Sequence, residues 1–134
     1  MAGETNLDVL LRSMRPVLKD GEYVFCTLPH PATPAPDLGA LRPVGLFHED
    51  EGLTLILHRE RADAAGLAYA GAFRLLTLSV HSSLDAVGFI AAVSTRLAAH
   101  GIGVNPVAAY YHDHLFVPAA RATEALALLE SFAR

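Results

Sequence analysis

A histidine stands directly before two serines at His81-Ser82-Ser83, a pairing that could supply a base and a nucleophile. A serine nucleophile needs a base within hydrogen-bond reach, a third group that orients the base, and donors for the oxyanion. Adjacent residues of a strand point to opposite faces, so His81 is poorly placed to activate Ser82. The sequence also has no Gly-x-Ser-x-Gly elbow. We therefore expect no catalytic residue and no enzymatic activity, and we interpret the serines as helix caps.

Ligand binding is a second use of the same stretch. Residues 84–99 have the periodicity of a helix, with Ser82 or Ser83 at its N-cap and Gly101 after its end. Free N–H groups at a helix start can hold the carboxylate of a ligand, and Asp85 can pair with an ammonium group. This strand–helix junction therefore has the donors and the acceptor that an amino acid needs.

Histidines elsewhere in the chain raise the question of a metal site. His112-Asp113-His114 places two imidazoles on one face of a strand, but three or four ligands must converge on a metal ion. A similar stretch in the first half of the chain, His48-Glu49-Asp50, has a single imidazole. We interpret both stretches as solvated turns and expect no metal and no cofactor. The remaining histidines that we considered stand alone in the sequence, at His30, His58 and His100.

Composition excludes several classes of partner. The 134 residues are 52% hydrophobic and 18% charged, enough for a real core and a partly apolar surface that suggests self-association. The net charge is -4 and no basic tract is present, which argues against nucleic acid and anionic membranes. No apolar run approaches a membrane span of roughly 20 residues. Cys26, which alternates with Val24 and Leu28, is expected to be a buried, inert thiol. We expect a cytoplasmic protein.

The elements that must position these residues follow from hydrophobic periodicity. Asn6 is expected to cap the first helix, and the proline-rich segment 29–43 is expected to have no regular structure. The predicted helices cover residues 7–14, 61–67, 84–99 and 121–132, and the predicted strands cover residues 23–28, 44–48, 53–58, 73–80, 104–111 and 115–117.

Two faces are predicted for the helix at 84–99. Small side chains on the second face would let another helix approach closely, and Phe89 is expected on a contact surface. The face expected against the sheet comprises Val87, Ile90, Ala91, Leu97 and Ala98, and the small-residue face comprises Gly88, Ala92, Thr95 and Ala99.

The two halves of the chain repeat the same order of elements. Residues 55–65 align with 115–125, so that Arg61-Ala62 falls on Arg121-Ala122. We also align Phe47-His48-Glu49 with Tyr111-His112-Asp113, and Leu7-Asp8 with Leu84-Asp85. Chance similarity in an alanine-rich chain is the alternative to duplication, which the matching order favours. Helices on one face of an antiparallel sheet predict an α+β fold of ferredoxin-like type.

Residues 73–132 resemble an ACT domain. The strand LLTLSV, the stretch SSLDAVGFIAAVSTRLAAHGIGVN and the hairpin AYYHDHLFVP follow that family's order, with Asp85 and Gly88 where its loop has an acidic residue and a glycine. The first half, with GEYVFCTLP and EGLTLIL, is similar to small bacterial tandem ACT-like proteins of unknown function. The resemblance implies two βαββαβ units, at residues 1–68 and 69–134.

The resemblance also implies a function. Members of this family bind small metabolites, usually amino acids, and are usually dimeric regulators. We therefore expect a non-enzymatic homodimer whose ligand lies at the strand–helix loop. Two alternatives stay open: a protein–protein interaction module without a ligand, and an uncharacterised enzyme that uses the cleft between the halves. The expected ligand-binding residues are His81, Ser82, Ser83, Leu84, Asp85, Val87, Gly88 and Asn105.

Overall fold

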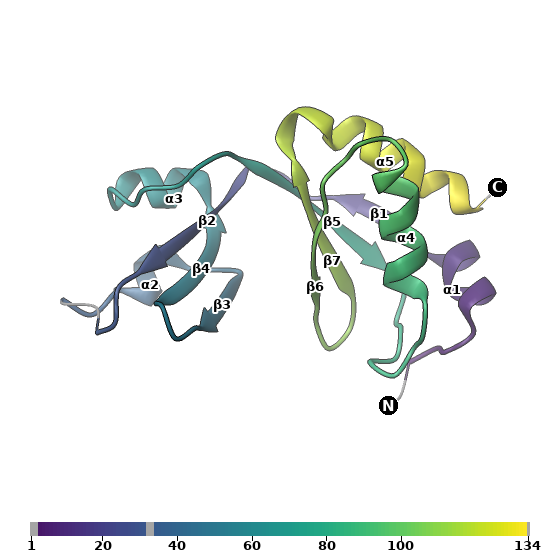
Figure 1. The fold of residues 1–134 in the computed structure, drawn as a ribbon, viewed down its shortest axis with the longest axis horizontal. Helices are drawn as coiled ribbons and strands as arrows, with labels where there is room; N and C mark the ends of the chain where they lie inside the picture. Colours follow the sequence, from purple (N-terminus) through teal and green to yellow (C-terminus); the bar gives the residue numbers. More distant parts are fainter. Residues whose placement is uncertain (1–2, 32–33, 134) are drawn as a thin grey trace. The chain divides into compact units, whose positions relative to one another are not determined.

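The computed structural model describes residues 3–31 and 34–133 (Figure 1). The chain divides into two compact units. One unit combines both ends of the chain, residues 1–20 and 74–134, and we call it the terminal unit. The other comprises residues 21–73, and we call it the inserted unit. Among the described residues, no helix is long and apolar enough to cross a membrane.

The terminal unit has a sheet in the order β1-β5-β7-β6. The chain runs β5, α4, β6, β7, α5, and the strand that would complete a βαββαβ unit is β1, from the start of the chain. β1 pairs antiparallel with β5, from Arg15 opposite Ser79 to Leu18 opposite Leu76. The elements are α1 (Leu7–Ser13), β1 (Arg15–Leu18), β5 (Phe73–Ser79), α4 (Phe89–Ala98), β6 (Asn105–Ala108), β7 (Asp113–Pro118) and α5 (Ala122–Glu130), with 3-10 turns η1 (Ala119–Arg121) and η2 (Ser131–Ala133) around α5.

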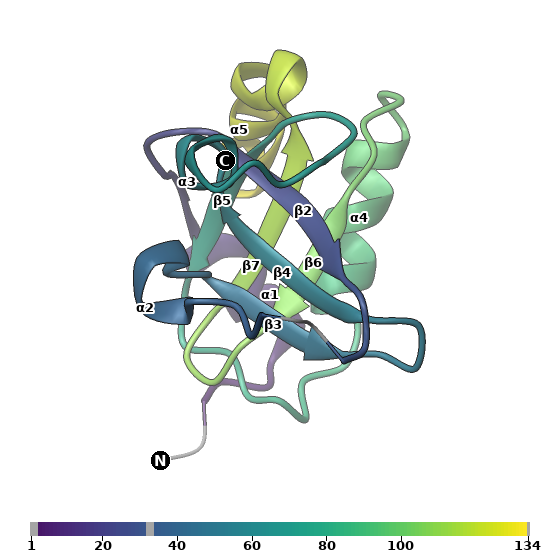
Figure 2. The ribbon, with the colours of Figure 1, turned by 90° about the vertical axis from the view of Figure 1, so that its left-hand side faces the viewer.

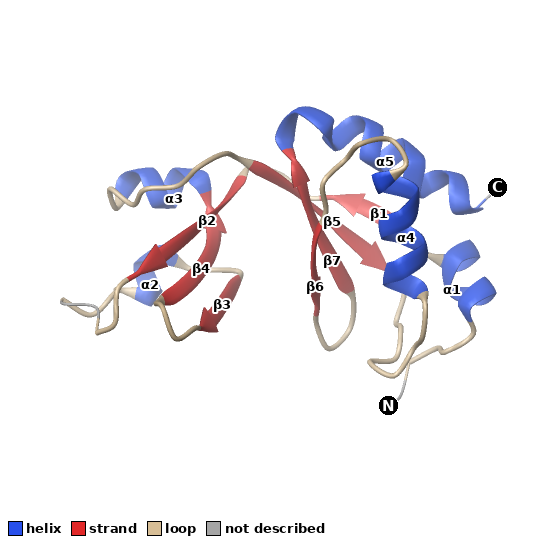
Figure 3. Cartoon of the chain, in the orientation of Figure 1, coloured by secondary structure: helices blue, strands red, loops and turns tan. Residues whose placement is uncertain are grey.

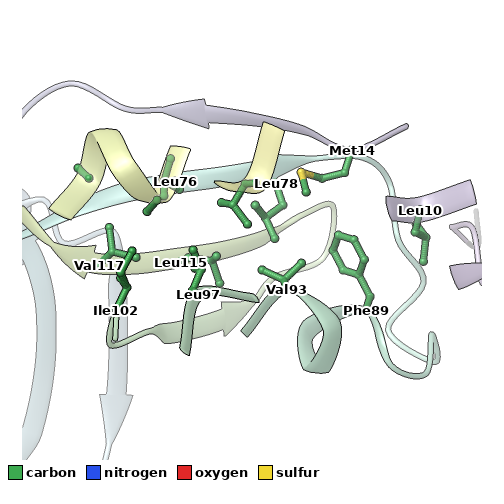
Figure 4. Packing of buried hydrophobic residues seen from close by; sticks show 13 residues of the cluster. Leu10, Met14, Leu76, Leu78, Phe89, Val93, Leu97, Ile102, Leu115 and Val117 are labelled. Atoms are coloured by element: carbon green, nitrogen blue, oxygen red, sulfur yellow. The ribbon is translucent and has the colours of Figure 1, made fainter. Parts of the chain in front are cut away.

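The core of the terminal unit lies between its sheet and its helices (Figures 3 and 4). β5 contributes Leu76 and Leu78, and α4 contributes Phe89, Val93 and Leu97, all at most 3% exposed. Each such side chain stabilises the fold by about 1.5–3 kcal/mol when fully buried. The other buried members are Leu10, Met14, Ile102, Leu115, Val117, Ala122, Ala125 and Leu129.

The inserted unit has the sheet order β3-β4-β2, with the start of β5 next to β2 through the pair Tyr23–Phe73 (Figure 2). Strand β2 pairs with β4 along its length, from Tyr23 opposite His58 to Leu28 opposite Leu53. The smaller core holds Cys26, as the sequence predicted, among Val24, Leu41, Leu53, Leu55, Leu57 and Ala62. The elements are β2 (Tyr23–Leu28), α2 (Leu38–Leu41), β3 (Gly45–His48), β4 (Leu53–His58) and α3 (Arg59–Ala64).

Most predicted elements are present, and the tandem ferredoxin-like fold is confirmed. Asn6 caps α1, because its side chain accepts a hydrogen bond from the Val9 N–H at 3.1 Å. The expectation of no regular structure in 29–43 was wrong at its end, where α2 forms. Asp37 allows this turn of helix because its carboxylate accepts the Ala40 N–H at 3.1 Å.

The start of α4 was predicted five residues too early. The helix begins at Phe89, after Gly88 adopts a φ of 90°, which favours glycine. Ser82 and Ser83 therefore do not cap it. The Ser83 hydroxyl instead accepts the Asp85 N–H at 3.1 Å and forms a local turn.

The faces of α4 were also misassigned. Phe89, Val93 and Leu97 are buried, whereas Val87 is 83% exposed because it lies before the helix. Ala91 and Ala98, expected against the sheet, are exposed. Alanine occurs on both buried and exposed faces of helices, so the sequence pattern was compatible with two buried faces of α4. The three larger side chains determine which face packs on the sheet.

Part of the internal repeat aligns as predicted, with Arg61 on Arg121, and part aligns differently. β4 and β7 have the same pattern of burial. The alignment that places Leu53 of β4 on Asp113 of β7 also places Arg61 on Arg121. Arg61 Nη1 donates to the Ala40 carbonyl and Arg121 Nη2 to the His100 carbonyl, each at 2.8 Å and each across 21 residues. Ala40, within α2, is therefore the counterpart of His100, which lies two residues after the end of α4.

Two other predicted alignments were wrong. The helix α1 belongs to the terminal unit and packs against α4 and η2, so Leu7-Asp8 is not the counterpart of Leu84-Asp85. The match of residues 47–49 with 111–113 was also wrong. His48 ends β3, whereas Asp113 begins β7.

Candidate functional site

The loop between β5 and α4 holds every predicted ligand residue except Asn105. Its first part is held by the N-terminal segment, because Glu4 forms a parallel bridge with Ser82. The Glu4 N–H donates to the His81 carbonyl at 2.8 Å, and the Ser83 N–H donates to the Glu4 carbonyl at 2.9 Å. A side chain at Gly3 would place its Cβ 2.5 Å from the His81 carbonyl oxygen, so this close approach needs glycine.

The β6–β7 turn and the start of β7 lie against the same loop. The buried Ser82 hydroxyl donates to Asp113 Oδ2 at 3.2 Å, and His112 Nδ1 donates to the Val80 carbonyl at 3.2 Å. The rings of His81 and Tyr111 lie with centroids 5.6 Å apart. The predicted solvated turn at 112–114 was therefore wrong, since Asp113 is only 9% exposed.

Asp113 is a buried carboxylate whose hydrogen-bond partner is the Ser82 hydroxyl. Burial raises its pKa, and this is opposed by the Ser82 hydroxyl and then by the two neighbouring histidines. Burial also lowers the pKa of His114, with the charge of His112 adding to the effect and Asp113 opposing it, so the neutral imidazole is favoured. Within the part of the chain that the structure describes, no lysine or arginine forms an ion pair with Asp113. A buried carboxylate in this setting favours binding of an ammonium or guanidinium group.

His114 lies on the other face of the sheet from Asp113, since neighbouring strand residues alternate. Its Nδ1 is 3.0 Å from the hydroxyl of Thr77, a buried residue of β5. Among residues 3–31 and 34–133, no group of three or more histidine, cysteine or acidic side chains is arranged to hold a metal ion.

The second half of the loop is open to solvent. Leu84 is 68% exposed, Val87 is 83% exposed, and Asp85 is also exposed. α4 then begins at Phe89 with no side chain bonded to its first N–H groups, so these donors are available to an anion. The helix start predicted as a carboxylate site thus lies at Phe89, after the loop.

Asn105 is not brought together with the loop. It begins β6, pairs with Phe116 of β7, and so lies at the opposite end of the hairpin from Asp113. β6 is also separated from β5 by β7. The residue that sequence reasoning missed is Asp113. A signal for it was present, because Asp113, Leu115 and Val117 alternate on one face of a strand.

Family comparison agrees with this architecture. Two ACT-domain models match in tandem, over residues 2–74 and 73–131. The chain belongs to the ACT-domain family. The family resemblance seen in the sequence is thereby confirmed. The two matches meet near the start of β5. The first 20 residues fall within the first match, but in the structure they belong to the terminal unit together with residues 74–134. The boundary expected between residues 68 and 69 stays a prediction.

Solved structures of two bacterial proteins are similar along most of the chain. A Vibrio cholerae protein of unknown function, described as a possible transport protein, is 48% identical, with 96% of each chain covered and a TM-score of 0.84. An Agrobacterium tumefaciens protein is 18% identical over 90% of this chain and 89% of that chain, with a TM-score of 0.73.

The regulatory subunit of aspartate kinase from Thermus flavus shares this fold. It is 11% identical, with all of both chains covered and a TM-score of 0.64. The search of curated proteins gave no match.

Proposed function

We propose that this protein is a non-catalytic regulatory ACT protein that binds an amino acid at the β5–α4 loop of the terminal unit. The observation that carries the proposal is the buried Asp113 carboxylate, whose hydrogen bond comes from the neutral Ser82 hydroxyl at 3.2 Å. The family and the fold shared with an aspartate kinase regulatory subunit support a regulatory role.

In this proposal, each end of the loop supplies one half of the recognition. Asp113, with Ser82, receives the cationic group of the ligand, because a charged partner offsets the cost of burying the carboxylate. The uncapped N–H groups at the start of α4 receive the carboxylate, helped by the helix dipole. The loop between Asp113 and the start of α4 is formed by His81, Ser83, Leu84, Asp85, Val87 and Gly88. Asn105 takes no part in ligand binding.

Regulation would act through a second copy of the chain or a target protein. Leu84 and Val87 on the loop, and Tyr110 and Tyr111 on the adjoining turn, are more than 60% exposed apolar or aromatic side chains. Such side chains favour protein contacts. We propose a homodimer in which a bound amino acid orders the loop and so changes the surface presented to the partner.

Calorimetry with each standard amino acid tests the proposal. We expect saturable binding to the wild-type protein and at least about tenfold weaker binding to Asp113→Asn, which removes the charge but keeps the shape. Asp50→Asn, in the exposed β3–β4 turn, is the matched control and should bind like the wild type. Asp85→Ala shows whether the cationic group of the ligand binds at Asp85, the acidic residue predicted from the sequence, instead of at Asp113. Equal affinity of wild type and Asp113→Asn would contradict the site, and no binding to any amino acid would favour an interaction module.

A further inference from the structure

The two units differ in how well the helical side of each sheet is filled. In the terminal unit, α4 has ten residues and buries Phe89, Val93 and Leu97 over the sheet. In the inserted unit, the same connection is proline-rich and its helix, α2, has four residues. The matching arginine–carbonyl bonds of Arg61 and Arg121 align Ala40 of α2 with His100, just after α4.

Carried back three residues, this alignment places an exposed polar residue where α4 has part of its core. Asp37, which is exposed, stands in the place of Leu97, which is fully buried. The second helix shows the consequence, because Ala125 is 0% exposed whereas its counterpart Ala65 is exposed.

A pocket occupies this underfilled region. Its volume is about 410 Å³, within the range of roughly 300–1,000 Å³ that is typical of small-molecule sites. It is lined by the end of β2, the proline-rich segment, α2 and the residues after α3, namely Leu28, Pro29, Pro34, Ala35, Pro36, Asp37, Ala40, Leu41, Ala65 and Leu67.

The lining indicates the chemistry of the occupant. Nine of its ten residues are leucine, proline or alanine, so the body of a ligand must be hydrophobic. Asp37 is the single ionisable lining residue. Its Oδ1 accepts the Ala40 N–H at 3.1 Å, and among the described residues no side chain forms an ion pair with it. A ligand that also has a positive group would complement this carboxylate.

We propose that the inserted unit has a second ligand site, distinct from the β5–α4 loop, that takes a compact hydrophobic amine. The hydrophobic body fills the space that the side chains of α4 fill in the terminal unit. The amino group lies at Asp37. Because Asp37 is exposed, burial of the body provides most of the affinity and the carboxylate provides selectivity for a cation.

The test uses phenethylamine as the probe and the full chain labelled with ¹³C in its alanine methyl groups. We expect saturable shifts of the Ala40 and Ala65 methyl resonances at millimolar probe. The Ala125 methyl resonance, at the matching place in the filled unit, should not shift and also reports an intact fold. Absence of shifts at Ala40 and Ala65 would overturn the proposal.

Two variants and one matched compound sharpen the result. Ala65→Leu should fill the pocket and weaken binding at least tenfold, whereas Ala64→Leu, exposed and outside the lining, should bind like the wild type. Equal binding by these two variants would place the probe elsewhere. Asp37→Asn keeps the helix cap but should weaken binding two- to fivefold. Phenylpropionate, with a carboxylate in place of the amine, should bind more weakly than phenethylamine, and equal binding would exclude a role for Asp37.

Discussion

The terminal and inserted units share a hairpin and its following helix but differ in the connection before the hairpin. β4 and β7 have identical patterns of burial, and Ala62 and Ala122 are both buried behind them. The preceding connection is a polar loop and a ten-residue helix in one unit, and a proline-rich segment with a four-residue helix in the other. The repeat therefore keeps the hairpin that builds the sheet and varies the connection, where ligands are proposed to bind.

The first strand position after the hairpin turn shows the same divergence at a single residue. Asp113 begins β7 and bonds to Ser82, whereas the residue at the matching position of β4 is Leu53, buried in an apolar core. One substitution between copies thus separates a polar site from a purely structural position. Only the terminal unit has the carboxylate on which the proposed amino-acid site depends.

The largest expected effect compares the two cores. Leu115→Ala should destabilise the protein by about 4 kcal/mol, and Leu55→Ala by about 2 kcal/mol, although both side chains are fully buried. The difference arises because Leu55 lies in the smaller, more loosely covered core, which can relax around a cavity. Urea unfolding, with the slope compared between variants, measures both values. Equal losses would mean that the inserted unit is packed as tightly as the terminal unit.

The second-largest effect is expected when Leu53, at the start of β4, and Asp113, at the start of β7, are each replaced by the other's residue type. Leu53→Asp should destabilise by about 3 kcal/mol, because it buries a carboxylate among apolar side chains. Asp113→Leu should stay within about 1 kcal/mol of the wild type in stability but lose amino-acid binding. Thermal unfolding and calorimetry on both variants test the exchange. Retained binding in Asp113→Leu would move the site away from this position.

The matching arginines should have matching, smaller effects. Arg121→Ala and Arg61→Ala should each cost about 1 kcal/mol, since each removes a charged hydrogen bond to a helix end at a partly exposed position. Arg121 also pairs with Glu124 at 2.8 Å, which adds little because both side chains are exposed. The lysine variants at both positions serve as controls for charge. A loss at one arginine alone would show that the two bonds are not equivalent.

The smallest effect concerns pH and the pair His114 and Thr54, which occupy matching strand positions. The pKa of His114 is lowered in the folded state, so the unfolded chain binds the proton more readily. Stability should therefore fall as pH drops below 6.5 towards the folded-state pKa. His114→Thr should lose this part of the pH dependence. Unfolding curves between pH 5 and 8, read against the wild type, give the difference, and an unchanged slope would contradict it.

Much of the fold could be predicted because its signals are local. The strands at 23–28 and 53–58 alternate or run apolar between clear turn residues, and the structure has the same bounds. The start of α4 could not be predicted, since Leu84, Asp85 and Ala86 suit a helix as well as a loop. Their conformation depends on Glu4, far away in the sequence, which takes the backbone groups of His81 and Ser83.

The candidate site divides in the same way. Sequence reasoning pointed to the loop from His81 to Gly88 as a candidate site, because a strand, a polar turn and a glycine before a helix are adjacent in the chain. It missed Asp113, since the partner hydroxyl on Ser82 is 31 residues away. It also placed Asn105 at the loop, although β7 separates its strand from β5.

The sequence by itself determined the elements, the repeat of the hairpin and the family, because periodicity and turn residues act within a few neighbours. Only the tertiary structure decided that β1 completes the sheet of the terminal unit, that Asp113 is buried against Ser82, and that the space beside Ala65 stays open. These features depend on which distant segments pack together. Burial and pKa follow from that packing and not from the identity of a residue alone.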